Sequence, residues 1–203
     1  MGRFERKKEK RKKFWTNIFL AAMFVFVVVG MSLGGVIGGF GGGGPDLKYG
    51  DYKFYIKEGD NNHYWTKIEG SEMPFYFLPS QVEDINMSSI IKNRLKESYL
   101  VMITFNPKDT TNLQAMEITR FDLSQFLGKV VYNGVLESSL EYDIPVITCE
   151  NATAQTPVIV LNMSDNTSIQ EVDNCIYLYG RGREFLRLRD RLLYSYHGVI
   201  KDE

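Results

Sequence analysis

A long uncharged segment near the N-terminus constrains this chain more than any other feature of its sequence. No charged side chain occurs in residues 14–45, and residues 18–29 (IFLAAMFVFVVV) are entirely apolar. A helix needs about 20 apolar residues to cross a hydrocarbon core of roughly 30 Å. Because the segment lacks the polar face of a surface helix, it predicts a transmembrane helix over residues 14–37, with Trp15 at the membrane interface.

The charges on either side of this segment predict its orientation. Residues 1–13 carry eight Lys and Arg side chains against Glu5 and Glu9, a net charge of +6. Subtracting these from the 24 basic and 25 acidic side chains of the whole chain leaves 16 and 23 in the other 190 residues, a net charge of −7. Since basic residues stay on the cytoplasmic side, we expect a signal-anchor with residues 1–13 as a cytoplasmic tail and the C-terminal part outside.

The position of the basic tail also bears on what it contacts. A tail beside the bilayer contacts anionic lipid head groups, which we favour over nucleic acid as its partner. A cleaved secretory signal is an alternative to a permanent anchor, although its apolar core usually spans only about 7 to 15 residues.

The glycines that follow the apolar run have two interpretations. Gly30, Gly34 and Gly38 recur at every fourth residue, a pattern that lets two membrane helices approach closely. So many glycines also weaken a helix, because each costs about 1 kcal/mol relative to Ala. We therefore interpret residues 38–48 as a flexible linker and keep helix pairing through the three glycines as the alternative.

The remaining residues, 49–203, predict one extracytoplasmic domain. A composition of 44% hydrophobic and 24% charged residues excludes general disorder. Alternating patterns at 52–57 and 63–69 predict a β-hairpin, and the apolar run at 100–105 begins a strand–helix–strand crossover. Further strands are predicted at 74–78, 145–149, 157–161 and 175–179, and helices up to residue 97, over 112–128 and over 183–196. The predicted fold class is α/β, a mixed β-sheet with packed helices, preceded by one transmembrane helix.

Two features of this domain are typical of an oxidising exterior. Cys149 and Cys175 are the only cysteines, and we expect a disulfide between them that closes a loop of about 25 residues, with two buried free thiols as the alternative. Chance predicts roughly one Asn-x-Ser/Thr sequon in such a chain. Four are present, so the glycosylation candidates are Asn86, Asn151, Asn162 and Asn166, with turn and cap roles as the alternative.

The sequence contains no recognisable catalytic, cofactor-binding or metal-binding motif. Cys149 as a nucleophile needs a base, and nothing in the spacing places His63 or His197 beside it. The two histidines also lack metal-ligand spacing. Aromatic residues concentrated in 49–77 suit a core, with a carbohydrate or protein contact face as the alternative.

Arginines crowd the predicted C-terminal helix. Arg183, Arg187 and Arg191 fall on one face and can hold a phosphate, a sulfate or an acidic partner. Salt bridges to Glu184, Asp190 and the acidic body of the domain are the interpretation we prefer, and the anion or partner contact is the alternative.

The overall layout resembles uncharacterised single-pass cell-surface proteins of archaea. The likeness covers mainly residues 145–200, with Thr-Cys-Glu-Asn-Ala-Thr at 148–153 and Cys-Ile-x-Leu-x-Gly at 175–180 before an Arg-rich helix. It implies a surface location and carries no known active site over to this chain.

We expect a membrane-anchored extracytoplasmic domain with a binding or structural role at the cell envelope, without a cofactor or enzymatic activity. Its expected partners are the lipid bilayer and envelope proteins, a second copy of the chain among them. The alternatives are an accessory subunit of a membrane transport or secretion complex and an anchored envelope hydrolase.

Overall fold

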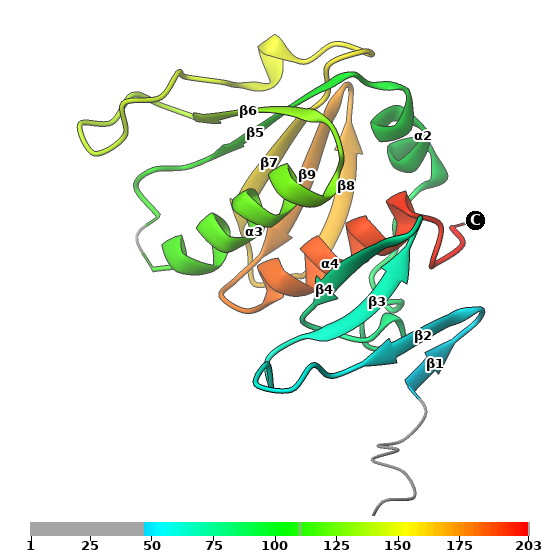
Figure 1. The fold of residues 1–203 in the computed structure, drawn as a ribbon. Helices are drawn as coiled ribbons and strands as arrows, with labels where there is room; N and C mark the ends of the chain where they lie inside the picture. The colour runs from blue at the N-terminus through cyan, green and yellow to red at the C-terminus, as the bar shows by residue number, and fades with distance from the viewer. Residues whose placement is uncertain (1–46, 110, 203) are drawn as a thin grey trace, which may run out of the picture. The chain divides into compact units, whose positions relative to one another are not determined.

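The structure is a computed structural model that describes residues 47–109 and 111–202 (Figure 1). The predicted basic tail, the predicted transmembrane helix and Gly30, Gly34 and Gly38 lie outside the described residues. Within the described residues, no helix combines the length and the hydrophobicity needed to cross a bilayer. These residues form an α/β fold with two sheets and three α-helices, which confirms the predicted mixture of elements.

The first sheet is antiparallel and contains the predicted hairpin. Its four strands follow one another in chain order: β1 (Leu47–Tyr49), β2 (Tyr52–Tyr55), β3 (Tyr64–Ile68) and β4 (Ser71–Phe75). The sequence predicts that the hairpin joins the mixed sheet, but it belongs to this separate sheet. Gly70 has a φ of 84°, a left-handed conformation that favours glycine, and it closes the tight turn between β3 and β4.

Strand β4 lies earlier in the chain than the predicted strand at 74–78. Pro74 has no N–H to donate and is tolerated because β4 is an edge strand. The strand ends after Phe75 because the next two backbone amides, of Tyr76 and Phe77, donate to the carboxylate of Asp190 instead of to a neighbouring strand.

The second sheet is mixed and has the strand order β6-β5-β7-β9-β8. Strands β5, β6, β7 and β9 are parallel, and the edge strand β8 is antiparallel to β9. Their bounds are β5 (Leu100–Phe105), β6 (Val130–Val135), β7 (Val158–Met163), β8 (Ser168–Val172) and β9 (Cys175–Gly180). The predicted parallel crossover is confirmed as β5, helix α3 (Leu113–Phe126) and β6.

The predicted strand at 145–149 is wrong. The segment makes one isolated bridge, between Val135 and Val146, and then forms the short 3-10 helix η2 (Cys149–Asn151). Polar side chains turn the chain here, because the Thr148 amide donates to Asn151 Oδ1 at 2.8 Å. Gly134 lets the segment approach β6, since a Cβ at this position would lie 2.6 Å from a side-chain carbon of Ile147.

The helices pack mainly on one face of the second sheet (Figure 1). Helix α4 (Glu184–Tyr196) buries its predicted apolar face. Helix α2 (Ser89–Glu97) is capped at its N-terminus by Ser88, whose Oγ accepts from the Ile90 amide. The opposite face of the sheet carries a smaller apolar cluster that includes Ile147, Val158 and Val160.

A buried carboxylate connects α4 to the first sheet. Asp190 is 0% exposed, and its Oδ2 accepts from the amides of Tyr76 and Phe77 at 2.7 Å each. Burial raises the pKa of Asp190 to about 6, against the lowering effects of Arg189 and of the two amides. The end of β4 is therefore held by a side chain from the last helix.

Arg189 completes this connection and is also 0% exposed. Its Nη1 donates to Asp190 Oδ1 at 2.5 Å and to the carbonyl of Pro74 at 2.9 Å, and its Nε lies 3.3 Å from Asp122 Oδ2 on α3. Three aromatic rings surround the guanidinium with centroids 5.2–5.4 Å from its central carbon: Phe75, Tyr76 and Phe126.

We predict that Asp190→Ala destabilises the protein by about 3–5 kcal/mol, because it leaves two partly buried backbone amides and a buried guanidinium without this acceptor. Urea denaturation of the full-length protein in lipid nanodiscs, followed by tryptophan fluorescence, measures the change. The matched control is Asp165→Ala, which removes an ion pair to Arg181 from a side chain that is 87% exposed. A cost near 1 kcal/mol or less for both variants would contradict the buried network.

Candidate functional site

The carboxyl ends of the four parallel strands lie at one edge of the second sheet, which is a common position for a binding site. Strands β5 and β7 are neighbours in the centre of the sheet. After β5 the chain continues through α3 to β6 on one side of this pair, and after β7 it continues to β8 and β9 on the other side. The N-termini of α3 and α4 follow the carboxyl ends of β5 and β9 and lie at this edge (Figure 1). Open α/β sheets bind ligands outside the carboxyl ends of their strands, where the connections diverge.

A crevice of about 360 Å³ lies at this edge, between the starts of the two helices. Residues from both helix starts line it: Thr111, Asn112, Gln114, Ala115, Ile118, Gly182, Arg183 and Leu186. The crevice is large enough for a small ligand or for one side chain of a partner.

Asn112 holds the two sides of the crevice together. Its Oδ1 accepts from the amide of Gly182 at 2.6 Å, and its Nδ2 donates to Thr111 Oγ1 at 2.9 Å and to Asp109 Oδ1 at 3.2 Å. The side chain bonds across 70 positions of the sequence and the residue is only 5% exposed. Gly182 has a φ of 54°, which favours glycine where the chain turns into α4.

The structure distinguishes the three arginines that the sequence places on one helical face. Arg187 bonds to Asp84 at 2.7 Å and to Glu184 at 2.8 Å. Arg191 is 4% exposed and pairs with Asp202 at 2.7 Å. These two match the salt-bridge interpretation, although Asp190 pairs with Arg189 and not with either of them.

Arg183 differs from its neighbours. It is exposed and forms no ion pair with any described residue, whereas Arg181, Arg187, Arg189 and Arg191 each pair with a carboxylate. The central carbon of its guanidinium lies 4.7 Å from the ring centroid of Phe77, so the ring supports the cation. A guanidinium held by a ring in this way can still donate hydrogen bonds to an anion.

A second, smaller hollow of about 180 Å³ also has Arg183 in its wall. The connection between β2 and β3 supplies Asn61, Asn62 and His63 to this hollow. His63 Nδ1 lies 2.9 Å from Asp60 Oδ1, which orients the ring. Partial burial raises the pKa of Asp60, but hydrogen bonds from His63, Trp65 and the Asn62 amide outweigh it and leave the pKa below its usual value.

The arrangement around Arg183 is rich in hydrogen-bond donors. The guanidinium, the side-chain amides of Asn61 and Asn62 and the starts of two helices all lie around the same two hollows. Helix N-termini carry a partial positive charge and favour anions nearby. Such a site can hold a carboxylate, phosphate or sulfate group.

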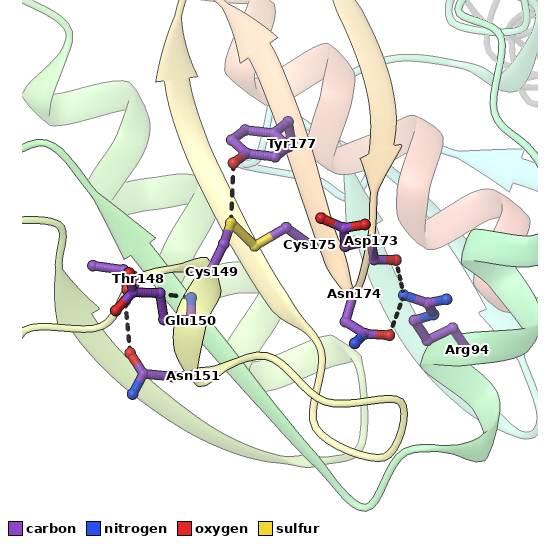
Figure 2. Close-up of a disulfide and its surroundings, with 9 residues drawn as sticks. All are labelled: Arg94, Thr148, Cys149, Glu150, Asn151, Asp173, Asn174, Cys175 and Tyr177. Atoms are coloured by element: carbon purple, nitrogen blue, oxygen red, sulfur yellow. Dashed lines mark hydrogen bonds between the residues drawn. A yellow bond between two sulfur atoms is a disulfide. The ribbon is translucent and has the colours of Figure 1, made fainter.

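The disulfide lies elsewhere, on the sheet face opposite the helices (Figure 2). Cys149 in η2 and Cys175 at the start of β9 are bonded with their Cα atoms 5.7 Å apart, which confirms the sequence prediction. Cys149 Sγ lies 3.0 Å from the hydroxyl of Tyr177. Arg94 fixes the neighbouring turn by donating to the carbonyl of Asp173 and to Asn174 Oδ1.

The four sequon asparagines differ in accessibility. Asn86 and Asn166 are exposed in connections between elements. Asn151 is exposed but uses its Oδ1 to accept from Thr148, and Asn162 is half-buried in β7. Asn86 and Asn166 therefore present the side chains best placed for modification, which stays a prediction.

Sequence reasoning did not identify Asn112, Gly182 or the Asp60–His63 pair as parts of a site. The available signal was position, because Asn112 is the first residue of the predicted helix at 112–128 and Gly182 lies between a predicted strand and the predicted helix at 183–196. Comparisons with protein-family models, with curated proteins and with solved structures return no match for this chain. The likeness to archaeal surface proteins stays a prediction, and the candidate site rests on its geometry.

Proposed function

We propose that this chain is a membrane-anchored extracytoplasmic protein that binds an anionic group of a partner at the cell envelope, with Arg183 as the main contact. The observation that carries the proposal is the environment of Arg183. It lacks a carboxylate partner among the described residues and lies in the walls of two hollows.

Local geometry explains why the ligand is an anion although the domain is acidic overall. The guanidinium presents a planar fork of N–H donors that matches carboxylate and phosphate oxygens. The nearby carboxylates of Glu184 and Asp84 are already paired with Arg187. Binding here depends on short contacts to Arg183 rather than on the long-range field of the domain, which is screened beyond about 10 Å.

The cellular location rests on two supports. The uncharged segment predicted to span the bilayer supplies the anchor, and the basic tail gives its orientation. The Cys149–Cys175 disulfide supports an exterior compartment, because disulfides persist mainly in oxidising environments.

We predict that protease added to intact cells degrades residues 49–203 and leaves residues 1–13 protected, because the anchor places them on opposite sides of the membrane. Epitope tags at the two ends, detected by immunoblotting, report the outcome. Detergent-permeabilised cells are the control and should lose both tags. Protection of the C-terminal tag in intact cells would exclude the proposed topology.

We predict that Arg183→Gln weakens the binding of inorganic phosphate, sulfate or a short polyglutamate peptide by about 10- to 100-fold, the loss expected for a charge-assisted hydrogen bond. Titration of the full-length protein in phosphatidylcholine nanodiscs, followed by calorimetry or NMR, measures the dissociation constants.

Arg181→Gln is the matched control, because its guanidinium pairs with Asp165 and lines neither of the two hollows. It should bind these probes like the unmodified protein. Equal binding by the Arg183 variant, or equal losses in both variants, would rule out Arg183 as the contact.

A further inference from the structure

A larger cavity, of about 670 Å³, shares no wall residue with the two hollows around Arg183. Its walls come from strand β1, the segment before α2, strand β8, helix α4 and the residues after α4. The side chains that matter for the argument are Tyr49, Glu83, Ile169, Arg191, Lys201 and Asp202. Its volume lies within the range of roughly 300–1,000 Å³ typical of small-molecule sites.

The charges in the walls of this cavity balance. Arg191 and Lys201 face two carboxylates, and Arg191 Nη2 bonds to Asp202 Oδ1 at 2.7 Å. Tyr49 donates its hydroxyl hydrogen to Glu83 Oε2 at 2.8 Å. A free anion would meet the two carboxylates and a free cation would meet Arg191 and Lys201, so the walls favour a ligand without net charge.

The innermost polar groups retain unused hydrogen-bonding capacity. The side chain of Asp202 is 0% exposed, and its Oδ2 has no hydrogen-bond partner among the described residues. Buried carboxylate oxygens are normally bonded. Arg191 donates from Nε to the Ile85 carbonyl, from Nη1 to Ser195 Oγ and from Nη2 to Asp202 Oδ1. Two of the five N–H groups of its guanidinium therefore remain without an acceptor among the described residues. An unused acceptor beside unused donors matches a hydroxyl group, which both donates and accepts.

Apolar surface lies next to these polar groups. Met87, Ile169 and Ile200 are buried side chains that reach the cavity, and Tyr49 adds an aromatic ring. A sugar ring has a hydroxylated rim and faces of C–H groups, so it needs both kinds of wall.

We propose that this cavity binds a neutral saccharide unit. Strands β1 and β8 in the walls are edge strands, but an extended peptide would bond mainly along their backbones and would leave the side-chain donors and acceptor of Arg191 and Asp202 unused. A saccharide is therefore the better match than a neutral peptide.

The test uses full-length protein in phosphatidylcholine nanodiscs, which contain no sugar head groups. The probes are cellobiose and N,N′-diacetylchitobiose as saccharides and a capped trialanine as a neutral peptide. Saturation-transfer NMR and calorimetry should detect saturable binding of at least one disaccharide with a dissociation constant of about 1 mM or tighter, and none of the peptide.

Three variants locate the binding. Asp202→Asn and Glu83→Gln should each weaken saccharide binding by at least about tenfold, because each removes a charged acceptor. Glu83 is exposed, so its variant keeps the test valid if Asp202→Asn unfolds the protein. Lys108→Gln, an exposed change that does not line the cavity, should bind normally.

Absence of saturable disaccharide binding, preferential binding of the peptide, or losses of equal size in Glu83→Gln and Lys108→Gln would each overturn the proposal. None of these three variants changes Arg183. Loss or retention of anion binding at Arg183 is therefore independent of the outcome for the saccharide.

Discussion

The carboxylate of Asp190 is the interaction on which the rest of the described structure depends. It is completely buried, and it accepts from two consecutive backbone amides, of Tyr76 and Phe77, just after β4 ends. A second hydrogen bond holds the same segment to α4, because the Tyr194 hydroxyl donates to the carbonyl of Phe77 at 2.6 Å. Leaving a buried charge without its partners costs several kcal/mol. This cost favours one position of α4 against the first sheet.

The candidate site follows from that position. Phe77 is bound through its amide to Asp190, and its ring supports Arg183 at the start of the same helix. Arg183 therefore lies where the crevice at the carboxyl edge of the second sheet and the hollow beside the β2–β3 connection meet. The buried ion pair thus connects the packing of the two sheets to the chemistry of one exposed cation.

The two hollows around Arg183 differ in chemistry from the larger cavity because α4 presents different residues to them. At its start Arg183 has no paired carboxylate among the described residues, so the site carries a local positive charge. Two turns later Arg191 is neutralised by Asp202 and held by the carbonyl of Ile85. One helix therefore offers a charged contact at one end and a neutral, donor- and acceptor-rich wall further along.

Local sequence patterns predict much of the fold but little of the site. The apolar run that forms β5, the periodic patterns of α3 and α4 and the disulfide between Cys149 and Cys175 are all visible in short stretches or in a cysteine count. Strand β8 escaped prediction because its sequence, SIQEV, does not alternate apolar and polar residues. The predicted strand at 145–149 failed because Thr148 and Asn151 bond to each other and turn the chain.

The difference between Arg183 and Arg187 cannot be predicted from local sequence patterns. Both arginines lie on the same helical face, but only Arg187 forms an ion pair with Asp84, which is 103 positions away in the sequence. The bond from Gly182 to Asn112 spans 70 positions. Such partners are set by tertiary packing, so helical periodicity alone does not show which cation remains available for a ligand.

Hydrogen exchange of the Tyr76 and Phe77 amides in the full-length protein tests the central role of Asp190 most directly. The account predicts that both amides exchange as slowly as Ile159 in the central strand β7, because breaking their bonds to a buried carboxylate requires unfolding of the domain. Exchange as fast as that of Gly59, in the exposed connection between β2 and β3, would contradict it.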